Sequence, residues 1–241
     1  MKIIITENYE EMSAKAFGLI KAVVTENPSA LLGLATGTTP LGLYSRMIED
    51  HKQNGTSYKD VSTVNLDEYE GLDASSDQSY VYFMRKNLFD GLDIDLKNTN
   101  IENGKAGDAQ AECARYNELL HSRAQDIQVL GIESNGHIAF NEPHTPFGSE
   151  THVVELAEST IRDNSRLFKS IDEVPRRAFT MGLKNIMNAK KILVLANGAS
   201  KAKAVYGMVR GAVTEEVPAS VLQLHPDCTL ICDKEAAALI V

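Results

Sequence analysis

The sequence predicts an α/β protein with an open, largely parallel, doubly wound sheet of the Rossmann-like kind and helices on both faces. Two observations lead to this fold class. Short runs of β-branched and other apolar residues recur along the chain, and segments with helical periodicity separate them. A third observation concerns organisation: the 241 residues contain no internal repeat, no low-complexity linker and no break in composition. We therefore expect a single domain over residues 1–241.

The predicted strands are short apolar runs, which are typical of strands buried on both faces of a parallel sheet. In chain order they are 2–6 (KIIIT), 30–35 (ALLGLA), 61–66 (VSTVNL), 127–132 (IQVLGI), 191–196 (KILVLA) and 228–233 (CTLICD).

The segments between these runs have the period of an amphipathic helix. In the first, one apolar stripe is formed at helical spacing by Met12, Ala16, Leu19, Ile20 and Val23. Further helices are expected over 40–51, 77–90, 107–123, 158–168 and 199–211.

The composition disfavours several classes of partner. The chain carries 24 basic and 33 acidic residues, a formal net charge of -9 at pH 7, which disfavours attraction to nucleic acid or anionic lipid. No stretch approaches the length of a membrane span, and the N-terminal sequence does not resemble a secretory leader. We expect a cytoplasmic protein with neither nucleic acid nor membrane as a partner. The cysteines, Cys113, Cys228 and Cys232, lack the paired spacing of a zinc site and are expected to be reduced and structural.

Ligands of open α/β sheets bind beyond the carboxyl ends of the strands, and four such ends carry polar residues. Thr36, Gly37, Thr38, Thr39 and Pro40 follow the second predicted strand. Thr39 suits the cap of the next helix, and Pro40 suits its first turn. Backbone N–H groups and threonine hydroxyls there could bind a phosphate. An ordinary capped turn is the alternative, because no Walker lysine or G-x-G-x-x-G pattern is present.

Two adjacent acids, Asp67 and Glu68, follow the third predicted strand. Neighbouring side chains of an extended strand point to opposite faces, so at most one of the two enters a given cleft. One acid is then a candidate base and the other a structural group. A pair of solvated acids in a loop is the alternative, and the residues alone favour it.

The stretch GIESNGHIAFNEP follows the predicted strand IQVL and is dense in polar side chains. His137 is the kind of side chain that moves protons near neutral pH, and Asn135 and Glu142 are candidates to orient or tune it. Gly136 lets the backbone turn tightly beside the histidine. A zinc site of His137, Glu142 and His144 matches no metal motif and offers too few soft ligands, so we expect no metal. A structural histidine in a turn is the remaining alternative.

The fourth strand end, NGASK, follows KILVLA and places Lys201 in the first turn of a helix. The helix dipole disfavours a cation at that position, so its placement indicates an anionic ligand, with a solvated lysine as the alternative. Arg166 in DNSRLF is a second candidate cation.

These stretches belong to a longer series of motifs that runs in order across almost the whole chain. The series is GLATGTTP, NLDEYEGL, QSYVYFM, NGHIAFNEP, NSRLF, MGLKNIM, GASKAKAV and LQLHPD. Together the motifs resemble the glucosamine-6-phosphate deaminases, of the glucosamine-phosphate isomerase/6-phosphogluconolactonase superfamily, in their short, non-allosteric form. The combination of DEY with GHIAFNEP is specific to the deaminase branch.

The resemblance implies that the protein converts D-glucosamine 6-phosphate and water into D-fructose 6-phosphate and ammonia without a redox cofactor. Asp67 would be the base that removes the C2 proton and returns it at C1 through an enolamine. His137, supported by Glu142, would open the pyranose ring by moving a proton between the ring oxygen and the anomeric oxygen. The implied phosphate cradle consists of Thr36, Gly37, Thr38, Thr39, Arg166 and Lys201.

Two positions depart from the family pattern. Some deaminases carry Asp where this chain has Asn135, although the shorter members often have Asn there. An amide can fix the tautomer of the histidine, but it cannot stabilise an imidazolium by charge. Glu133 stands where the family commonly has Gly, and we expect it to face solvent.

Two other functions are compatible with the fold that the resemblance implies. A 6-phosphogluconolactonase shares a related Gly-His turn, but NLDEY and FNEP suit proton abstraction from carbon better than lactone opening. A sugar-phosphate sensor of a transcription regulator would need a DNA-binding module, and none is expected because the chain begins almost at the first predicted strand.

The resemblance also bears on regulation. Hexameric members are activated by N-acetylglucosamine 6-phosphate, through basic residues shortly after FNEP and a longer C-terminal tail. Here the segment reads SETHVVEL, with His152 and Val154 where those cations would lie, and the sequence ends at Val241. An effector without differential affinity for two states cannot shift their populations. We therefore expect hyperbolic kinetics, no such activation, and a monomer or small homo-oligomer acting on the small molecule D-glucosamine 6-phosphate.

Overall fold

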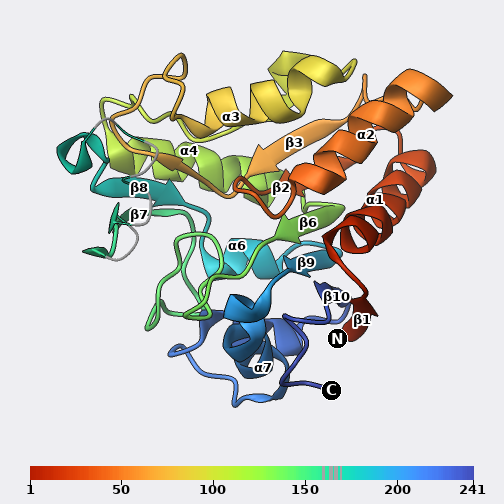
Figure 1. Ribbon diagram of the computed structural model, residues 1–241. Coiled ribbons are helices and arrows are strands. Elements are labelled where there is room, and N and C mark those ends of the chain that lie inside the picture. Colours follow the sequence, from red (N-terminus) through yellow and green to blue (C-terminus); the bar gives the residue numbers. More distant parts are fainter. Residues whose placement is uncertain (159–160, 163–164, 166–167, 169) are drawn as a thin grey trace.

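Seven parallel strands form the central sheet of the computed structural model, in the order β1-β10-β9-β6-β2-β3-β5 (Figure 1). The structure describes residues 1–158, 161–162, 165, 168 and 170–241. The strand bounds are β1 Lys2–Thr6, β2 Leu31–Leu34, β3 Ser62–Asn65, β5 Thr99–Asn100, β6 Ile127–Leu130, β9 Ile192–Ala196 and β10 Cys228–Asp233. All six predicted strands are present, and the short edge strand β5 is an addition.

Helices cover both faces of this sheet, which confirms the predicted doubly wound fold (Figure 1). Met12 and Leu43 pack on one face with β9 residue Leu193. Leu120 and Val205 pack on the other face with the next β9 residue, Val194. The first face carries α1 Tyr9–Glu26, α2 Leu41–Asn54 and α3 Tyr80–Asn87, and the second carries α4 Ala109–Ser122, α6 Leu183–Met187 and α7 Ala202–Arg210.

The predicted helices agree with the structure apart from their ends. The apolar stripe of α1 faces the core, with Leu19 only partly buried. α3 is shorter than predicted because Ser79 caps its first turn, accepting a hydrogen bond from the Tyr82 N–H at 3.1 Å. The segment 199–211 begins as the 3-10 turn η5, Ala199–Lys201, and continues as α7. The helix predicted over 158–168 lies partly outside the described residues.

β1 departs from the prediction that every strand is buried on both faces. Its residues Ile3 and Ile5 are exposed. β1 is an edge strand that pairs only with β10 in the described sheet. Ile3 and Ile5 lie two positions apart and share one face, whereas Ile4 packs against the core on the other. The apolar run KIIIT predicts a strand, but apolar composition does not indicate whether that strand lies at the centre or at the edge of the sheet.

A second, three-stranded antiparallel sheet was not predicted. It consists of β4 Asp67–Tyr69, β8 Arg177–Thr180 and β7 His152–Glu155, with β8 in the middle. The chain leaves the parallel sheet at Leu66, whose carbonyl accepts a hydrogen bond from the Met181 N–H at 2.7 Å. A small apolar cluster packs under this sheet and includes Tyr69, Phe140, Leu156, Ile161, Val174 and Ala178.

Within the part of the chain that the structure describes, no helix has both the length and the apolar character needed to cross a bilayer. Cys113, Cys228 and Cys232 are buried and free, as expected.

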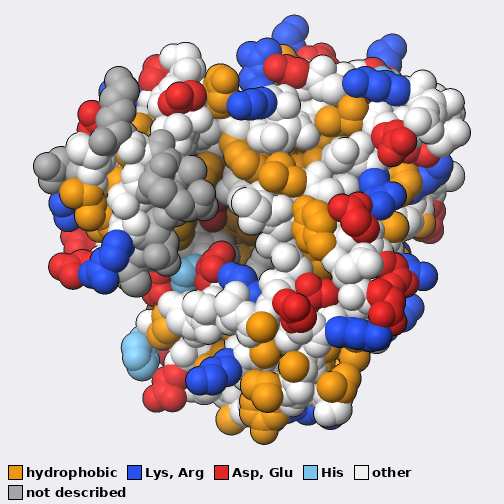
Figure 2. Space-filling model, viewed as in Figure 1, with side chains coloured by type: hydrophobic (Ala, Val, Ile, Leu, Met, Phe, Trp, Pro, Cys, Tyr) orange, Lys and Arg blue, Asp and Glu red, His pale blue; other side chains and the backbone are white. Residues whose placement is uncertain are grey.

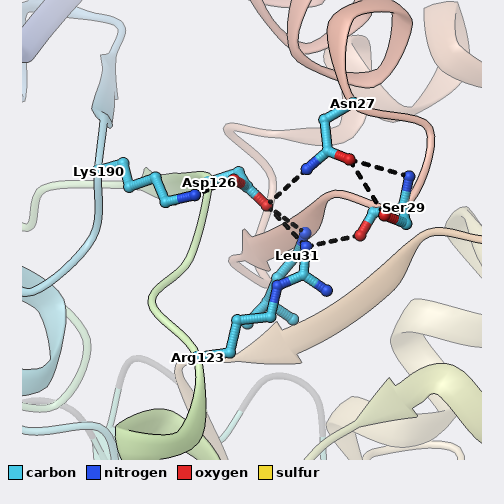
Figure 3. Close-up of polar contacts among 6 residues, drawn as sticks. All are labelled: Asn27, Ser29, Leu31, Arg123, Asp126 and Lys190. Atoms are coloured by element: carbon cyan, nitrogen blue, oxygen red, sulfur yellow. Dashed lines mark hydrogen bonds and ion pairs between the residues drawn. The ribbon is translucent and has the colours of Figure 1, made fainter.

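One carboxylate ties several elements together at the amino end of the parallel strands (Figure 3). Asp126 precedes β6 and accepts hydrogen bonds from the Leu31 N–H at 2.8 Å and from Lys190 Nζ at 2.7 Å. Arg123 Nη2 lies 3.0 Å from Asp126 Oδ2, and Asn27 Nδ2, from the residue after α1, lies 3.4 Å from the same oxygen. Burial alone would raise the pKa of Asp126, but Lys190 and the Leu31 N–H outweigh it, so the pKa is lowered from its ordinary value.

Replacing Asp126 by alanine should lower the free energy of unfolding by about 2–3 kcal/mol at neutral pH, because the variant leaves a buried N–H and two cations without their acceptor. The loss should disappear as the pH falls below about 4, because a depressed carboxyl pKa contributes stability only while the group is ionised. Urea denaturation measures both effects. The matched control is Asp90→Ala, whose exposed ion pair with Arg85 should contribute less than about 1 kcal/mol. Equal losses in the two variants would contradict this role.

Candidate active site

The predicted site residues follow strands on either side of the point where the strand order reverses. β2, β3 and β5 are added in one direction, and β6, β9 and β10 are added in the other, so the reversal lies between β2 and β6. Open α/β sheets bind their ligands at such a point, beyond the carboxyl ends of the strands. The space-filling view shows a hollow in one face of the molecule, with a histidine and with acidic and basic side chains at its edge (Figure 2).

The turn after β2 is exposed and contains a glycine in the left-handed region. Gly37 has φ +92°, a conformation that favours glycine. Thr36, Thr38 and Thr39 are exposed or partly exposed around it. The predicted cap is wrong: Pro40, not Thr39, immediately precedes α2, and no side chain caps the helix from that position.

A tyrosine from α1 holds this turn in place of a threonine cap. The Tyr9 hydroxyl accepts a hydrogen bond from the Gly42 N–H at 2.7 Å and donates to the Thr38 carbonyl at 3.1 Å. The turn is therefore fixed from outside, and the threonine hydroxyls are not used for capping.

Asp67 and Glu68 are both buried, so the alternative of two solvated acids is wrong. They lie on strand β4 and therefore point to opposite sides of it. The Glu68 carboxylate accepts hydrogen bonds from the backbone N–H groups of Tyr69, Tyr80 and Val81 at 2.8 to 3.1 Å. Glu68 thus binds the start of α3 and is the structural member of the pair.

Asp67 has the properties of a base. Burial, together with the charge of Glu68 beside it, raises the pKa of Asp67 to about 8. Burial also raises the pKa of Glu68, against the effect of its three backbone donors. Those donors favour the ionised form of Glu68, so of the two acids Asp67 is the one that more readily holds a proton near neutral pH. A carboxyl with a pKa near the working pH is suited to accept and return a proton.

The turn after β6 holds His137 in one orientation. The Nδ1 atom of this buried side chain lies 3.0 Å from Glu142 Oε2. Asn135 Nδ2 donates to the same oxygen at 2.8 Å, and Asn135 Oδ1 accepts the His137 N–H at 3.1 Å. An ionised carboxylate can only accept, so Nδ1 carries the hydrogen and Nε2 of the neutral ring carries the lone pair. Glu142, and not the Asn135 amide, therefore sets the tautomer.

Backbone geometry explains why this turn needs its glycine. Gly136 has φ +86°, and a Cβ at this position would lie 2.8 Å from Val217 Cγ1. Ala139 also has a positive φ, 52°. Two side chains hold the chain in this shape: Asn141 Nδ2 donates to the Met181 carbonyl at 2.9 Å, and the Phe140 N–H donates to Thr180 Oγ1 at 3.1 Å.

Sequence reasoning missed the role of Thr180. Its backbone is opposite Asp67 in the β4–β8 pairing, while its hydroxyl binds the turn that carries His137. Thr180 therefore connects the two candidate proton-transfer groups. The motif MGLKNIM begins one residue later, but nothing in the local pattern indicates the contact.

Lys201 ends the turn after β9 and directly precedes α7. Its Nζ lies 2.6 Å from Glu133 Oε2, and the Lys201 side chain is only 18% exposed, so the alternative of a solvated lysine is wrong. Glu133 faces solvent, as expected, but it also pairs with Lys201. The contact joins the segment after β6 to the segment after β9, which are neighbouring strands.

Two remaining expectations concern Arg166 and metals. Arg166, the second predicted cation, lies outside the described residues. Among the residues that are described, no group of three or more His, Cys, Asp and Glu side chains is arranged to hold a metal ion.

Residues 6–231 match the family model described as glucosamine-6-phosphate isomerases/6-phosphogluconolactonase. The glucosamine-6-phosphate deaminase of Geobacillus sp. (strain WCH70) is 52% identical over 241 residues, which are 100% of this chain and 96% of the relative. The glucosamine-6-phosphate deaminase of Thermoanaerobacter pseudethanolicus (strain ATCC 33223 / 39E) is also 52% identical, over 100% of this chain and 95% of the relative.

Solved structures agree with this result. The structure of a monomeric glucosamine-6-phosphate deaminase matches with a TM-score of 0.97 and 46% identity, over 99% of this chain and 100% of the other. The 6-phosphogluconolactonase of Trypanosoma brucei matches with a TM-score of 0.80 and 21% identity, over 100% of this chain and 98% of the other. The second likeness shows the fold alone.

Proposed function

The chain belongs to the family of glucosamine-6-phosphate isomerases and 6-phosphogluconolactonases, and we propose that within it the protein acts as a glucosamine-6-phosphate deaminase. The enzyme converts D-glucosamine 6-phosphate and water into D-fructose 6-phosphate and ammonia, in a catalytic domain that spans residues 1–241. The observation that carries this function is the buried carboxyl of Asp67, with its pKa near 8, connected through Thr180 to the turn of His137. Opening a lactone requires no base for a carbon-bound proton.

His137 performs the first step in this proposal. Its Nε2 lone pair accepts the proton of the anomeric hydroxyl. The imidazole then donates a proton to the pyranose ring oxygen as the bond between C1 and that oxygen breaks. Glu142 holds Nδ1–H at 3.0 Å and stabilises the imidazolium that forms in between. Asn135 keeps Glu142 in place through the hydrogen bond at 2.8 Å.

Asp67 performs the second step. Its carboxylate removes the proton from C2 of the open-chain sugar while the aldehyde oxygen takes a proton from the substrate's own ammonium group, which leaves a neutral enolamine, and Asp67 then returns its proton to C1. The C2–H bond breaks, and an O–H and a C1–H bond form, which turns the aldose into the protonated imine of a ketose. Water then adds at C2 and ammonia leaves, giving fructose 6-phosphate. Burial keeps Asp67 protonated once it has taken the proton, so the same group can deliver it.

The phosphate is bound by the turn after β2 and by Lys201. Thr36, Gly37, Thr38 and Thr39 offer hydroxyls and backbone N–H groups near the start of α2, and Lys201 supplies a cation near the start of α7. Arg166 is proposed as a further cation from its motif alone.

Lys201→Met should raise the KM for glucosamine 6-phosphate about tenfold or more, because an ionic hydrogen bond contributes ~1.5–3 kcal/mol. Weak binding of unphosphorylated glucosamine, measured as inhibition, should scarcely change. Lys184→Met is the matched control, since Lys184 also pairs with a glutamate, Glu150 at 2.7 Å. Equal losses for the phosphorylated and unphosphorylated sugars would assign Lys201 a structural role instead.

The function itself is tested by incubating purified protein with glucosamine 6-phosphate in the presence of EDTA. Ammonia and fructose 6-phosphate should form in equal amounts, and 6-phosphogluconolactone hydrolysis, run alongside, should be slower. We further propose a cytoplasmic monomer or small oligomer with hyperbolic kinetics and no response to N-acetylglucosamine 6-phosphate, a proposal supported by the likeness to a monomeric deaminase. Absence of turnover, or faster lactone hydrolysis, would overturn the assignment.

A further inference from the structure

We propose that Glu133 is a built-in competitor of the substrate's phosphate group for Lys201, and that it sets the affinity of the enzyme for phosphorylated sugars. The proposal rests on the proposed function for its substrate. Glu133 Oε2 lies 2.6 Å from Lys201 Nζ. The cation that is best placed to bind the phosphate therefore already has an anionic partner from the protein.

The Lys201 side chain differs from the other lysines that form ion pairs among the described residues. It is 18% exposed, whereas the side chains of Lys21, Lys184, Lys190 and Lys234 are between 38% and 62% exposed. Solvent screens an ion pair less when the cation is partly withdrawn from water. The Glu133 carboxylate, at 60% exposed, is the solvated member of the pair.

The surroundings of Lys201 favour an anion. Lys201 is the residue before α7, where the helix dipole repels a cation and attracts a negative charge. No side chain caps α7 from that position. The nearby Gly198 N–H is already bound by the Asp233 carboxylate, at 2.9 Å. Glu133 is thus the anion that offsets an unfavourable charge when no phosphate is bound.

The backbone keeps this anion close to Lys201. The Glu133 N–H donates to the His137 carbonyl at 3.0 Å, and the Glu133 carbonyl accepts the Gly136 N–H at 2.9 Å. Glu133 is therefore anchored at the base of the turn that carries the ring-opening histidine. A tethered partner competes at a high effective concentration, so a phosphate must displace it or bind beside a like charge. In both cases removing the negative charge strengthens phosphate binding.

The test compares the Glu133→Gln variant with the wild-type enzyme. Glutamine keeps the size of the side chain and removes its charge. The KM for glucosamine 6-phosphate should fall about fivefold, and the dissociation constant of inorganic phosphate, measured by calorimetry, should fall by a similar factor. The effect should appear in KM and not in kcat. Glu7→Gln is the matched control, because Glu7 forms an ion pair of the same length, 2.6 Å, with Lys234.

A double variant identifies the route of the effect. In the Lys201→Met background, Glu133→Gln should change both constants by clearly less than in the wild type, because the two side chains no longer compete and only the repulsion between carboxylate and phosphate remains. Unchanged or weaker phosphate binding in Glu133→Gln would overturn the proposal, since it would mean that the carboxylate positions Lys201 and does not compete. The same is true of an equal gain in the Glu7→Gln control. Phosphate binding is measured without turnover, so a failure of the proposed function would show separately, as wild-type protein that binds phosphate but releases no ammonia.

Discussion

Replacing Asp67 by asparagine should lower kcat for ammonia release by ~10²–10⁴-fold, the usual effect of removing a general base. The amide keeps the shape of the side chain but cannot accept the proton from C2. Substrate binding should be largely unchanged, because the proposed phosphate site lies elsewhere. Near neutral pH the fold should be about as stable as in the wild type, since asparagine replaces a buried carboxyl that is mostly protonated there.

The same carboxyl predicts the pH dependence of the wild-type enzyme. Asp67 must be ionised to act as a base, and burial with the charge of Glu68 raises its pKa to about 8. The value of kcat/KM reports the free enzyme, so it should fall by about tenfold for each pH unit below about 8. Steady-state rates across that range measure it. A flat profile, or normal kcat in Asp67→Asn, would refute the role, and Asp77→Asn in the exposed loop after β4 serves as the control.

Replacing His137 by glutamine should lower kcat by about 10²-fold, mainly by slowing ring opening. Glutamine can form a hydrogen bond to Glu142, but it cannot carry a proton from the anomeric oxygen to the ring oxygen. Loss of the C2 proton from an open-chain analogue of the substrate should therefore be spared in this variant and lost in Asp67→Asn. Proton exchange followed by NMR separates the two steps.

The control for His137 is His121→Gln, because His121 also contacts a carboxylate, Glu150 at 3.1 Å, but lies on the exposed side of α4. It should keep wild-type turnover. If exchange from the open-chain analogue falls as far in His137→Gln as in Asp67→Asn, the proposed division of the two steps is wrong.

The central sheet was predictable from the sequence because its signal is local. Runs such as ILVLA in β9 are apolar over their whole length, and α1 shows a clear helical stripe. The small sheet was not predictable, because its strands have three or four residues and include charged ones. The two adjacent acids of β4 predicted a solvated loop. The burial of Glu68 is favourable because it binds N–H groups at the start of α3, which are distant in the sequence.

In the candidate site, too, some residues could be predicted from local sequence and their contacts could not. Their strand-end positions made Asp67, His137 and Lys201 candidates, and the family resemblance then favoured Asp67 over two solvated acids. Glycine at position 136 is required by its positive φ. The partners of these residues come from far along the chain. Lys201 and its partner Glu133 are 68 residues apart in the sequence, and Thr180 is 40 residues from Phe140, whose N–H it binds. Such contacts depend on strand order, which a single sequence does not specify locally.

The central claim, that Asp67 moves a carbon-bound proton and so makes this enzyme a deaminase, is tested most directly by following deuterium from C2. Purified wild-type enzyme should cleave the C2–D bond of [2-²H]glucosamine 6-phosphate in step with ammonia release, with the label found on C1 of fructose 6-phosphate or in water. Asp67→Asn should cleave that bond at least about 100-fold more slowly. Ammonia release with deuterium still on C2, or equal cleavage by wild type and Asp67→Asn, would contradict the account.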